Sequence, residues 1–452
     1  MNEVIEQVDV HSTTEAINLL IGSGEQQKIE GLLSDLHAGE VATVIESLPN
    51  EQRQIIWPYV PADKHADILA EVGDEVLLSI VEEMGSEELV TAASNMESND
   101  LALIIEELPA DLGNEIKASL DEDILERLET NLTFEEGTAG RLMSADFITV
   151  RSNVSVSAVG RYLRLRKTLP ENTDCLMVID REGYYLGKLP LQNLLTADED
   201  AKVEDVMQLD EKAVSALMEE HELANHFEDR DLLSVAVVDD HQLLLGRITV
   251  DDVLDILREQ ATHAVMSGTG LDDDVDLFAP VKKSVRTRSL WLGINLATAL
   301  LASWVIGIFE ATIEQVVALA VLMPIVASMG GIAGSQTLAL IMRGQALNQI
   351  SHTNQLWLLK KEISIGLLNG AVWAVVIAVV AGLWFKSLPI GLIIGVAIVV
   401  NLVAAAFAGF AVPMSLKKLG VDPAISAAVV LTTVTDVVGF FAFLGLATVF
   451  LV

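Results

Sequence analysis

One acidic residue, Asp436, lies inside a long apolar run near the C-terminus, in the sequence LTTVTDVVGFF. A charged side chain at the centre of a membrane-spanning helix costs about 2.5 to 3.5 kcal/mol, so such a residue usually faces water, an ion or a polar partner. In a helix, Thr432, Thr433 and Gly439 share one face with Asp436. A carboxylate, two hydroxyls and a glycine on one face suit a cation. The alternative is a structural carboxylate that hydrogen-bonds to a neighbouring helix.

A second polar pattern lies in the apolar stretch LMPIVASMGGIAGSQTLAL, which contains Pro324, Gly330, Gly331 and Gly334. The pattern is compatible with a locally opened helix whose backbone carbonyls, including those of Gly330 and Gly331, face a pore. It is equally compatible with an intact helix in which Gly330 and Gly334 allow close packing against a neighbour.

Five apolar segments are long enough to position these residues in a membrane, since about 20 residues of helix cross the hydrocarbon. They cover residues 290–309, 315–342, 363–385, 387–416 and 423–452. Nine Lys/Arg residues flank them on one side and only Lys386 on the other. The bias predicts a cytoplasmic N-terminus and an external C-terminus. Glu310 then lies in an external turn, where it either collects cations or is an ordinary solvated acid.

The charge is divided unevenly along the 452 residues, whose formal net charge is −37. Residues 281–452 carry ten Lys/Arg and five Asp/Glu, so the first 280 residues hold 18 bases and 60 acids. Such an acidic surface repels nucleic acid and anionic lipid and attracts cations.

The single cysteine, Cys175, excludes a disulfide framework and a thiolate metal cluster. The opening residues lack the basic and apolar regions of a secretory signal.

The acidic part divides into two predicted domains. Residues 1–136 form a helical domain, because apolar spacings of three and four recur between Leu-Pro pairs at 48/49 and 108/109. Residues 137–262 contain short β-branched runs at 147–150, 176–179, 235–238 and 243–248, spaced as two repeats of about 60 residues, 137–200 and 201–262.

The second repeat ends in VVDDHQLLLGRITVDDVLDIL, which resembles the end of a CBS domain, with a hydroxyl at Thr249 and an acid at Asp252. The first copy has Pro190 and Asn193 at those positions. In CBS pairs such a Thr and Asp can hold a nucleotide phosphate and ribose, so the resemblance implies that any adenine nucleotide bound here, such as ATP, would use the second repeat rather than the first. A helix-capping role accounts for Thr249 and Asp252 equally well.

Motifs of enzymes and of metal-binding loops fail on spacing. HELANH at 221–226 places its histidines five apart, where a zinc protease needs four. DDDVD at 272–276 lacks the glycine and glutamate of a calcium loop. The chain has no P-loop and no nucleophile elbow. We therefore expect no enzyme and no ATP-driven pump.

The order of domains, the glycine pattern of the second apolar segment, VDPA at 421–424 and TVTD before Val437 together resemble the MgtE family of bacterial magnesium channels. The resemblance covers residues 20–452 and implies an all-α N-domain, an α/β CBS pair, a connecting helix at 263–289 and a five-helix pore domain at 290–452. It implies a homodimer in the inner membrane, with Asp436 of both subunits at the ion site.

The acidic part is expected to compact when Mg²⁺ bridges its carboxylates, so that high internal Mg²⁺ closes the pore. Asp231, Asp252 and Asp255 are the candidate regulatory ligands. Two departures from the family stand out: Ile332 replaces a common asparagine, and the usual run of acids after Asp255 is interrupted by Arg258, Gln260 and His263. The alternatives are a nucleotide-sensing transporter of Mn²⁺, Co²⁺ or another solute, and a membrane-anchored scaffold without transport.

Overall fold

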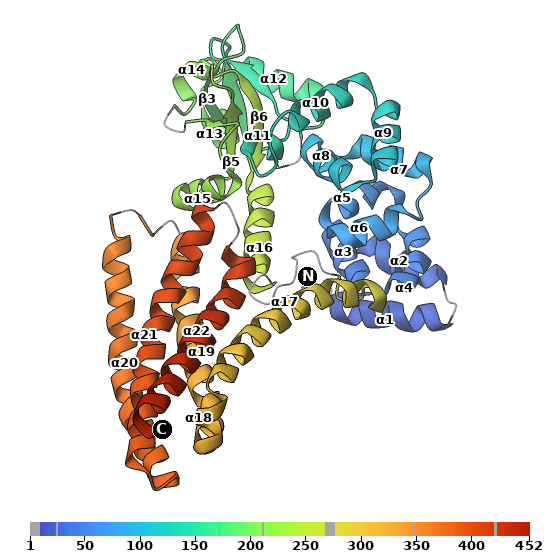
Figure 1. Cartoon of the computed structure of the whole chain (residues 1–452). Helices are drawn as coiled ribbons and strands as arrows, with labels where there is room; N and C mark the ends of the chain where they lie inside the picture. The colour runs from blue at the N-terminus through green and yellow to red at the C-terminus, as the bar shows by residue number, and fades with distance from the viewer. Residues whose placement is uncertain are drawn as a thin grey trace, which may run out of the picture. The chain divides into compact units, whose positions relative to one another are not determined.

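The structure, a computed structural model, describes residues 10–23, 26–170, 172–209, 212–266, 276–346, 349–351, 353–419 and 423–452. The chain divides into two compact units (Figure 1). The first comprises residues 1–260 together with 274–280, and the second comprises residues 261–273 and 281–452.

The first unit begins with a series of short helices (Figure 1). Their buried side chains form one apolar core. In α3 the buried side chains recur three and four residues apart, as an amphipathic helix requires. Its start is fixed by His37, whose ring accepts from the Gly39 amide, and by Glu40, which accepts from the His37 amide at 2.8 Å. The α-helices are α1 (Val10–Ser23), α2 (Gln26–Asp35), α3 (Ala38–Glu46), α4 (Asn50–Ile56), α5 (His65–Glu71), α6 (Asp74–Val81), α7 (Ser86–Asn95), α8 (Ser98–Glu107), α9 (Ala110–Ser119) and α10 (Glu122–Leu132), with 3-10 turns at Trp57–Tyr59 and Ala62–Lys64.

Each of the two Leu-Pro pairs lies between one helix and the next. Pro49 and Pro109 are the residues immediately before α4 and α9. Leu48 and Leu108 are buried in the core of the helical domain. Each pair therefore stops one helix, inserts a leucine into the core and starts the next.

Two three-stranded sheets of the same topology follow, which confirms the predicted repeat. In each, the first strand is parallel to the second and the second is antiparallel to the third. The strands are β1 (Thr149–Arg151), β2 (Cys175–Ile179), β3 (Tyr185–Pro190), β4 (Val214–Ser215), β5 (Ser234–Val238) and β6 (Leu244–Thr249). The accompanying helices are α11 (Ala139–Leu142), α12 (Val156–Arg166), α13 (Leu191–Thr196), α14 (Val203–Val206), α15 (Glu220–Arg230) and α16 (Val250–Met266).

The prediction of one connecting helix at 263–289 is wrong for the described residues. Residues 263–266 are the end of α16, residues 276–280 are not helical, and residues 281–289 are the start of a longer helix, α17 (Val281–Ile308). Pro280 explains the boundary, because a proline disfavours helical backbone in the residue before it and suits a helix start.

The second unit contains the five membrane-length helices that the sequence predicts, by length and composition of the described residues. They are α17, α19 (Ala318–Ala346), α20 (Gln355–Trp384), α21 (Leu388–Lys418) and α22 (Pro423–Leu451), with the short α18 (Glu310–Gln315) after α17 (Figure 1). Within this unit α21 is the most buried, whereas α17 and α20 expose many large apolar side chains. Exposed apolar faces of this size suit lipid or a second protein chain.

Candidate functional site

The candidate ion site is a groove between α19 and α22, within the second unit. It encloses about 650 Å³. The wall formed by α22 contributes Thr432 and Asp436, and α19 contributes Ala327, Ser328, Gly331, Ile332, Ser335, Gln336 and Ala339. The groove thus combines one carboxylate with hydroxyl and amide side chains, whose oxygens are donors that Mg²⁺ and Ca²⁺ prefer.

Helix α22 sets the direction of the carboxylate. The hydroxyls of Thr432 and Thr433 each donate to the carbonyl four residues earlier, at 2.9 and 2.8 Å. Asp436 is half-buried and, among the described residues, has neither an ion pair nor a hydrogen bond within the chain. The interhelical hydrogen bond of the structural alternative is therefore not present among these residues.

The predicted polar face of α22 is divided between two neighbours. Asp436 and Thr432 line the groove, Thr433 does not, and Gly439 packs against the Asn401 amide of α21. Asn401 donates to the Val326 carbonyl of α19 at 2.8 Å, so it joins α21 to α19. Buried amides of this kind hold helices together inside membranes.

The glycines of α19 also have two roles. The helix is continuous through this stretch, so the described backbone contains no opened turn. A methyl group at Gly330 would collide with the Asn401 amide, and one at Gly334 would lie 2.8 Å from Leu431, which identifies both as close-packing positions. Gly331 has open space beside it and lines the groove. Ile332 lines the groove as well and is 59% exposed in the single chain.

Sequence reasoning missed a second carboxylate in the helical bundle, Glu362 of α20. It is 4% exposed and accepts a hydrogen bond from the Thr337 hydroxyl of α19 at 3.2 Å. Lys361 lies 4.0 Å from its other oxygen. The adjacent lysines made Glu362 look like part of a solvated flank. The available signal was periodicity, since Gly366 and Gly370 follow at intervals of four and pack closely against α21.

Glu310 is exposed at the start of α18, in the turn between α17 and α19. The structure does not bring it to the groove. If Glu310 attracts cations, it does so through its charge at the surface, because it does not share a site with Asp436.

In the first unit, the N-termini of α8 and α16 bring acids together. The Asn99 amide of α8 donates to the Asp252 carboxylate of α16 at 3.0 Å. Burial raises the pKa of Asp100 to about 8, and nearby carboxylates, of which Asp252 contributes most, add to the rise. Burial also raises the pKa of Asp252 to about 7, although hydrogen bonds from Thr249 oppose it. Burial and the Glu71 carboxylate raise the pKa of Asp255.

We call Glu97, Asp100, Asp251, Asp252 and Asp255 the acidic cluster. Within the described ranges, no three or more Asp, Glu, His or Cys side chains converge as ligands of one ion. The donor chemistry of the acidic cluster fits a divalent cation, whereas its present arrangement is not a formed site. Asp231 is not one of these residues. It is exposed, adopts a left-handed conformation with φ of 52° and follows the last residue of α15 as its C-cap.

Thr249 and Asp252 interact with each other. The Asp252 carboxylate accepts from the Thr249 amide at 2.9 Å and from its hydroxyl at 3.0 Å, at the start of α16. This is one half of a capping box, in which the carboxylate of the third helical residue accepts from the backbone amide that precedes the helix. At the matching place of the first repeat, Pro190 precedes α13 and Asn193 donates to the Val206 carbonyl at 2.9 Å.

Five membrane-length helices, a groove that contains a carboxylate and a large acidic part suit one class of protein, the membrane transporters for cations. Two family models match the chain, one described as a divalent cation transporter (MgtE, residues 323–446) and one as the MgtE intracellular N domain (residues 36–137). The magnesium transporter MgtE of Thermus thermophilus is 31% identical over 436 residues, covering 95% of this chain and 96% of that protein. The chain belongs to the MgtE family of magnesium transporters.

Two further comparisons agree with this assignment. The magnesium transporter MgtE of Bacillus subtilis is 26% identical over 435 residues, which cover 96% of each chain. A crystal structure of the cytosolic domain of the Mg²⁺ channel MgtE in complex with ATP matches with 25% identity and a TM-score of 0.51. It covers 54% of this chain and 99% of that structure. The predicted family and fold class are confirmed.

Proposed function

We propose that two copies of this chain form a Mg²⁺ channel in the inner membrane that admits the ion and closes when cytoplasmic Mg²⁺ is high. The N-terminus lies in the cytoplasm and the C-terminus outside. The groove that Asp436 and Thr432 line is the observation that carries the proposal. Since the groove is open along α19, a second subunit would complete it and add a second Asp436.

The size of the groove fits a hydrated ion. Mg²⁺ prefers octahedral coordination and gives up its waters reluctantly. Six waters at about 30 Å³ each occupy roughly 200 Å³, which is less than the 650 Å³ of the groove. The carboxylate then acts on the hydrated ion through water. A membrane potential of 100 mV contributes about 2.3 kcal/mol per charge, so a dication enters without ATP hydrolysis.

Regulation would use the acidic cluster, together with Asp231 as a peripheral acid. Its carboxylates repel one another, and a dication placed among them would remove that repulsion. Binding would draw the N-termini of α8 and α16 together and favour the closed channel. Asp252 and Asp255 are the ligands for which both position and electrostatics support the role.

ATP binding by the second CBS repeat is the remaining part of the proposal. The related cytosolic domain solved with ATP supports it. The Thr249 hydroxyl already donates to Asp252, so a nucleotide would have to replace this hydrogen bond. Nucleotide titration of wild type and Thr249→Ala decides the point, because a purely capping threonine predicts equal affinity.

Mg²⁺ flux into proteoliposomes tests the channel. Asp436→Asn keeps the shape of the side chain and removes its charge, so we expect normal folding and loss of flux. Thr435→Val is the matched control, because Thr435 is buried on the same helix and does not line the groove. A well-folded Asp436→Asn dimer that conducts at the wild-type rate would falsify the assignment.

The competing substrates are Mn²⁺ and Co²⁺. Ile332 gives a reason to test them, because it places an apolar side chain in the groove. Flux of each metal in turn through the same proteoliposomes measures the preference. Higher permeability to Co²⁺ than to Mg²⁺ would favour this second candidate.

A further inference from the structure

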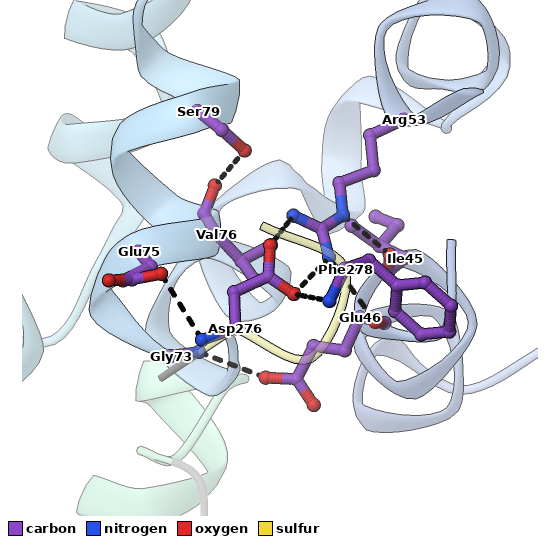
Figure 2. A network of polar contacts seen from close by, with 9 residues as sticks. All are labelled: Ile45, Glu46, Arg53, Gly73, Glu75, Val76, Ser79, Asp276 and Phe278. Carbon is purple, nitrogen blue, oxygen red and sulfur yellow. Dashed lines mark hydrogen bonds and ion pairs between the residues drawn. The ribbon is translucent and has the colours of Figure 1, made fainter. Parts of the chain in front are cut away.

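Residues 276–279 lie against the helical N-domain, although they directly precede α17 in the chain. Asp276 contacts Arg53 of α4, which is 223 residues away in sequence (Figure 2). The two side chains are 2% and 7% exposed. A buried ion pair between segments this far apart is costly to form unless its geometry is good.

The geometry is that of a paired, two-point contact. Arg53 Nη1 lies 2.6 Å from Asp276 Oδ2, and Nη2 lies 2.8 Å from Oδ1. Two parallel hydrogen bonds between a guanidinium and a carboxylate are among the strongest polar contacts in proteins. Both oxygens of Asp276 are thereby occupied, so this carboxylate is neither a solvated acid nor a free cation ligand.

Arg53 is held in place by its own domain. Its Nε donates to the Ile45 carbonyl at 3.0 Å and its Nη2 donates to the Glu46 carbonyl at 3.3 Å. These carbonyls belong to the last turn of α3, where carbonyls lack helical partners and the helix dipole favours a cation. The guanidinium is therefore held by α3 through contacts that do not involve Asp276.

The Asp276 segment has matching contacts of its own (Figure 2). Its backbone amide donates to Glu75 of α6 at 3.2 Å, and the Phe278 amide donates to Asp276 Oδ1 at 2.8 Å. Close by, the Glu46 carboxylate accepts from the Gly73 amide at 3.0 Å and joins α3 to the start of α6. The segment thus lies against two helices of the N-domain.

We propose that Arg53, Ile45, Glu46 and Glu75 form a docking site on the N-domain for the Asp276 segment of the same chain. Through this Arg53 docking site the N-domain is connected to α17 by a route that does not pass through the CBS pair. Only residues 277–280 separate Asp276 from Val281, the first residue of α17. A movement of the N-domain would then act directly on the first membrane helix.

The docking does not depend on a bound metal ion, because a protein guanidinium already neutralises the carboxylate. In this respect the Arg53 docking site differs from the acidic cluster, in which the carboxylates repel one another. Its role in gating rests on the proposed function, whereas its existence does not. The two are therefore measured separately.

Hydrogen exchange of the full-length protein in detergent, followed by mass spectrometry, tests the docking. In the wild type, a peptide covering residues 276–280 should be protected with or without Mg²⁺. Asp276→Asn should speed its exchange at least about tenfold, because a charge-assisted pair is lost. This variant leaves Arg53 and its α3 contacts intact. Glu51→Gln, an exposed acid on the same helix as Arg53, is the matched control and should change nothing.

Wild-type exchange at the rate of an unstructured peptide would overturn the docking, and so would unchanged protection in Asp276→Asn. In a second variant, Arg53→Gln, the peptide should again exchange faster, while α5 and α6 stay protected if the domain is folded.

Flux is then measured over a range of internal Mg²⁺. If wild type closes with Mg²⁺, Asp276→Asn should shift the midpoint severalfold, and an unchanged midpoint would overturn the coupling to α17. A wild type without any Mg²⁺ dependence would contradict the proposed function and leave the exchange result standing.

Discussion

Raising the pH should loosen the contact between α8 and α16 when divalent cations are absent. The pKa of Asp100 is raised to about 8 by burial and by the nearby Asp252 carboxylate. An unfolded aspartate has a pKa near 3.9. Between these values the folded state binds more protons than the unfolded state, so stability falls as the pH rises. The stabilising contribution is fully present below pH 4 and is lost by about pH 8.

The magnitude follows from the same shifts. One carboxyl changes the free energy of opening by at most about 1.4 kcal/mol per pH unit. Between pH 6 and pH 8, Asp100 titrates over both units and Asp252, with a pKa of about 7, over one. The two carboxylates interact, and solvent screens them partly. A loss on the order of 2 to 3 kcal/mol is expected, which is roughly a hundredfold change in the local opening equilibrium.

Hydrogen exchange of peptides from the first turns of α8 and α16 measures this loss, after correction for the intrinsic pH dependence of exchange. Millimolar Mg²⁺ should restore protection at pH 8 and have less effect at pH 6, because the pKa values of Asp100 (about 8) and Asp252 (about 7) leave these two carboxyls mostly protonated there. Asp100→Asn should flatten the pH dependence, whereas Asp111→Asn, an exposed acid on α9, should not. Equal protection at pH 6 and pH 8 in the wild type would refute the electrostatic account of the acidic cluster.

Three further predictions concern single positions. Ile332→Asn should raise the Mg²⁺ to Co²⁺ flux ratio, since it replaces an apolar wall of the groove with an amide; an unchanged ratio would show that this side chain does not meet the ion. Gly330→Ala should lower the stability of the solubilised protein by about 1 to 3 kcal/mol through overpacking against the Asn401 amide, and Gly331→Ala is the control with open space, expected to unfold as the wild type does. Thr249→Ala removes the hydroxyl that donates to Asp252 and keeps the Thr249 amide, so thermal unfolding should show a loss of about 0.5 to 1.5 kcal/mol, and an unaltered midpoint would show that this hydroxyl does not support the start of α16.

The sequence was sufficient for elements whose signal is local. Apolar length identified all five membrane-length helices, because a soluble helix does not need so long an apolar run with at most one charge. Repeated β-branched runs predicted β1, β2, β5 and β6, whereas no run was predicted at β3 or β4: β4 has only two residues, and β3 contains a glycine and ends in a proline. The start of α17 was placed about nine residues too late, since its basic first turns are helical without being apolar.

Contacts between distant segments could not be predicted in this way. Asp276 stood in a run of acids, and nothing in that run distinguishes the one that meets Arg53. Thr432 and Thr433 are equivalent in sequence pattern, and only the packing of α22 against α19 separates the residue that lines the groove from the one that does not. The split between Gly330 and Gly331 has the same origin, because it depends on where Asn401 of α21 lies.

The carboxylates of this chain differ in what already neutralises them, and this difference decides which can act on a divalent cation. Asp276 gives both oxygens to Arg53, and Glu362 is buried with a hydroxyl and a lysine nearby. The Asp252 carboxylate accepts hydrogen bonds from the Thr249 backbone amide and from the Asn99 side-chain amide. A cation that binds Asp252 must replace these hydrogen bonds, which costs little because water can take their place. Asp436 borders an open groove and, within the described residues, has no protein cation beside it. Removing a charge should therefore affect docking at Asp276, packing at Glu362, regulation at Asp252 and permeation at Asp436.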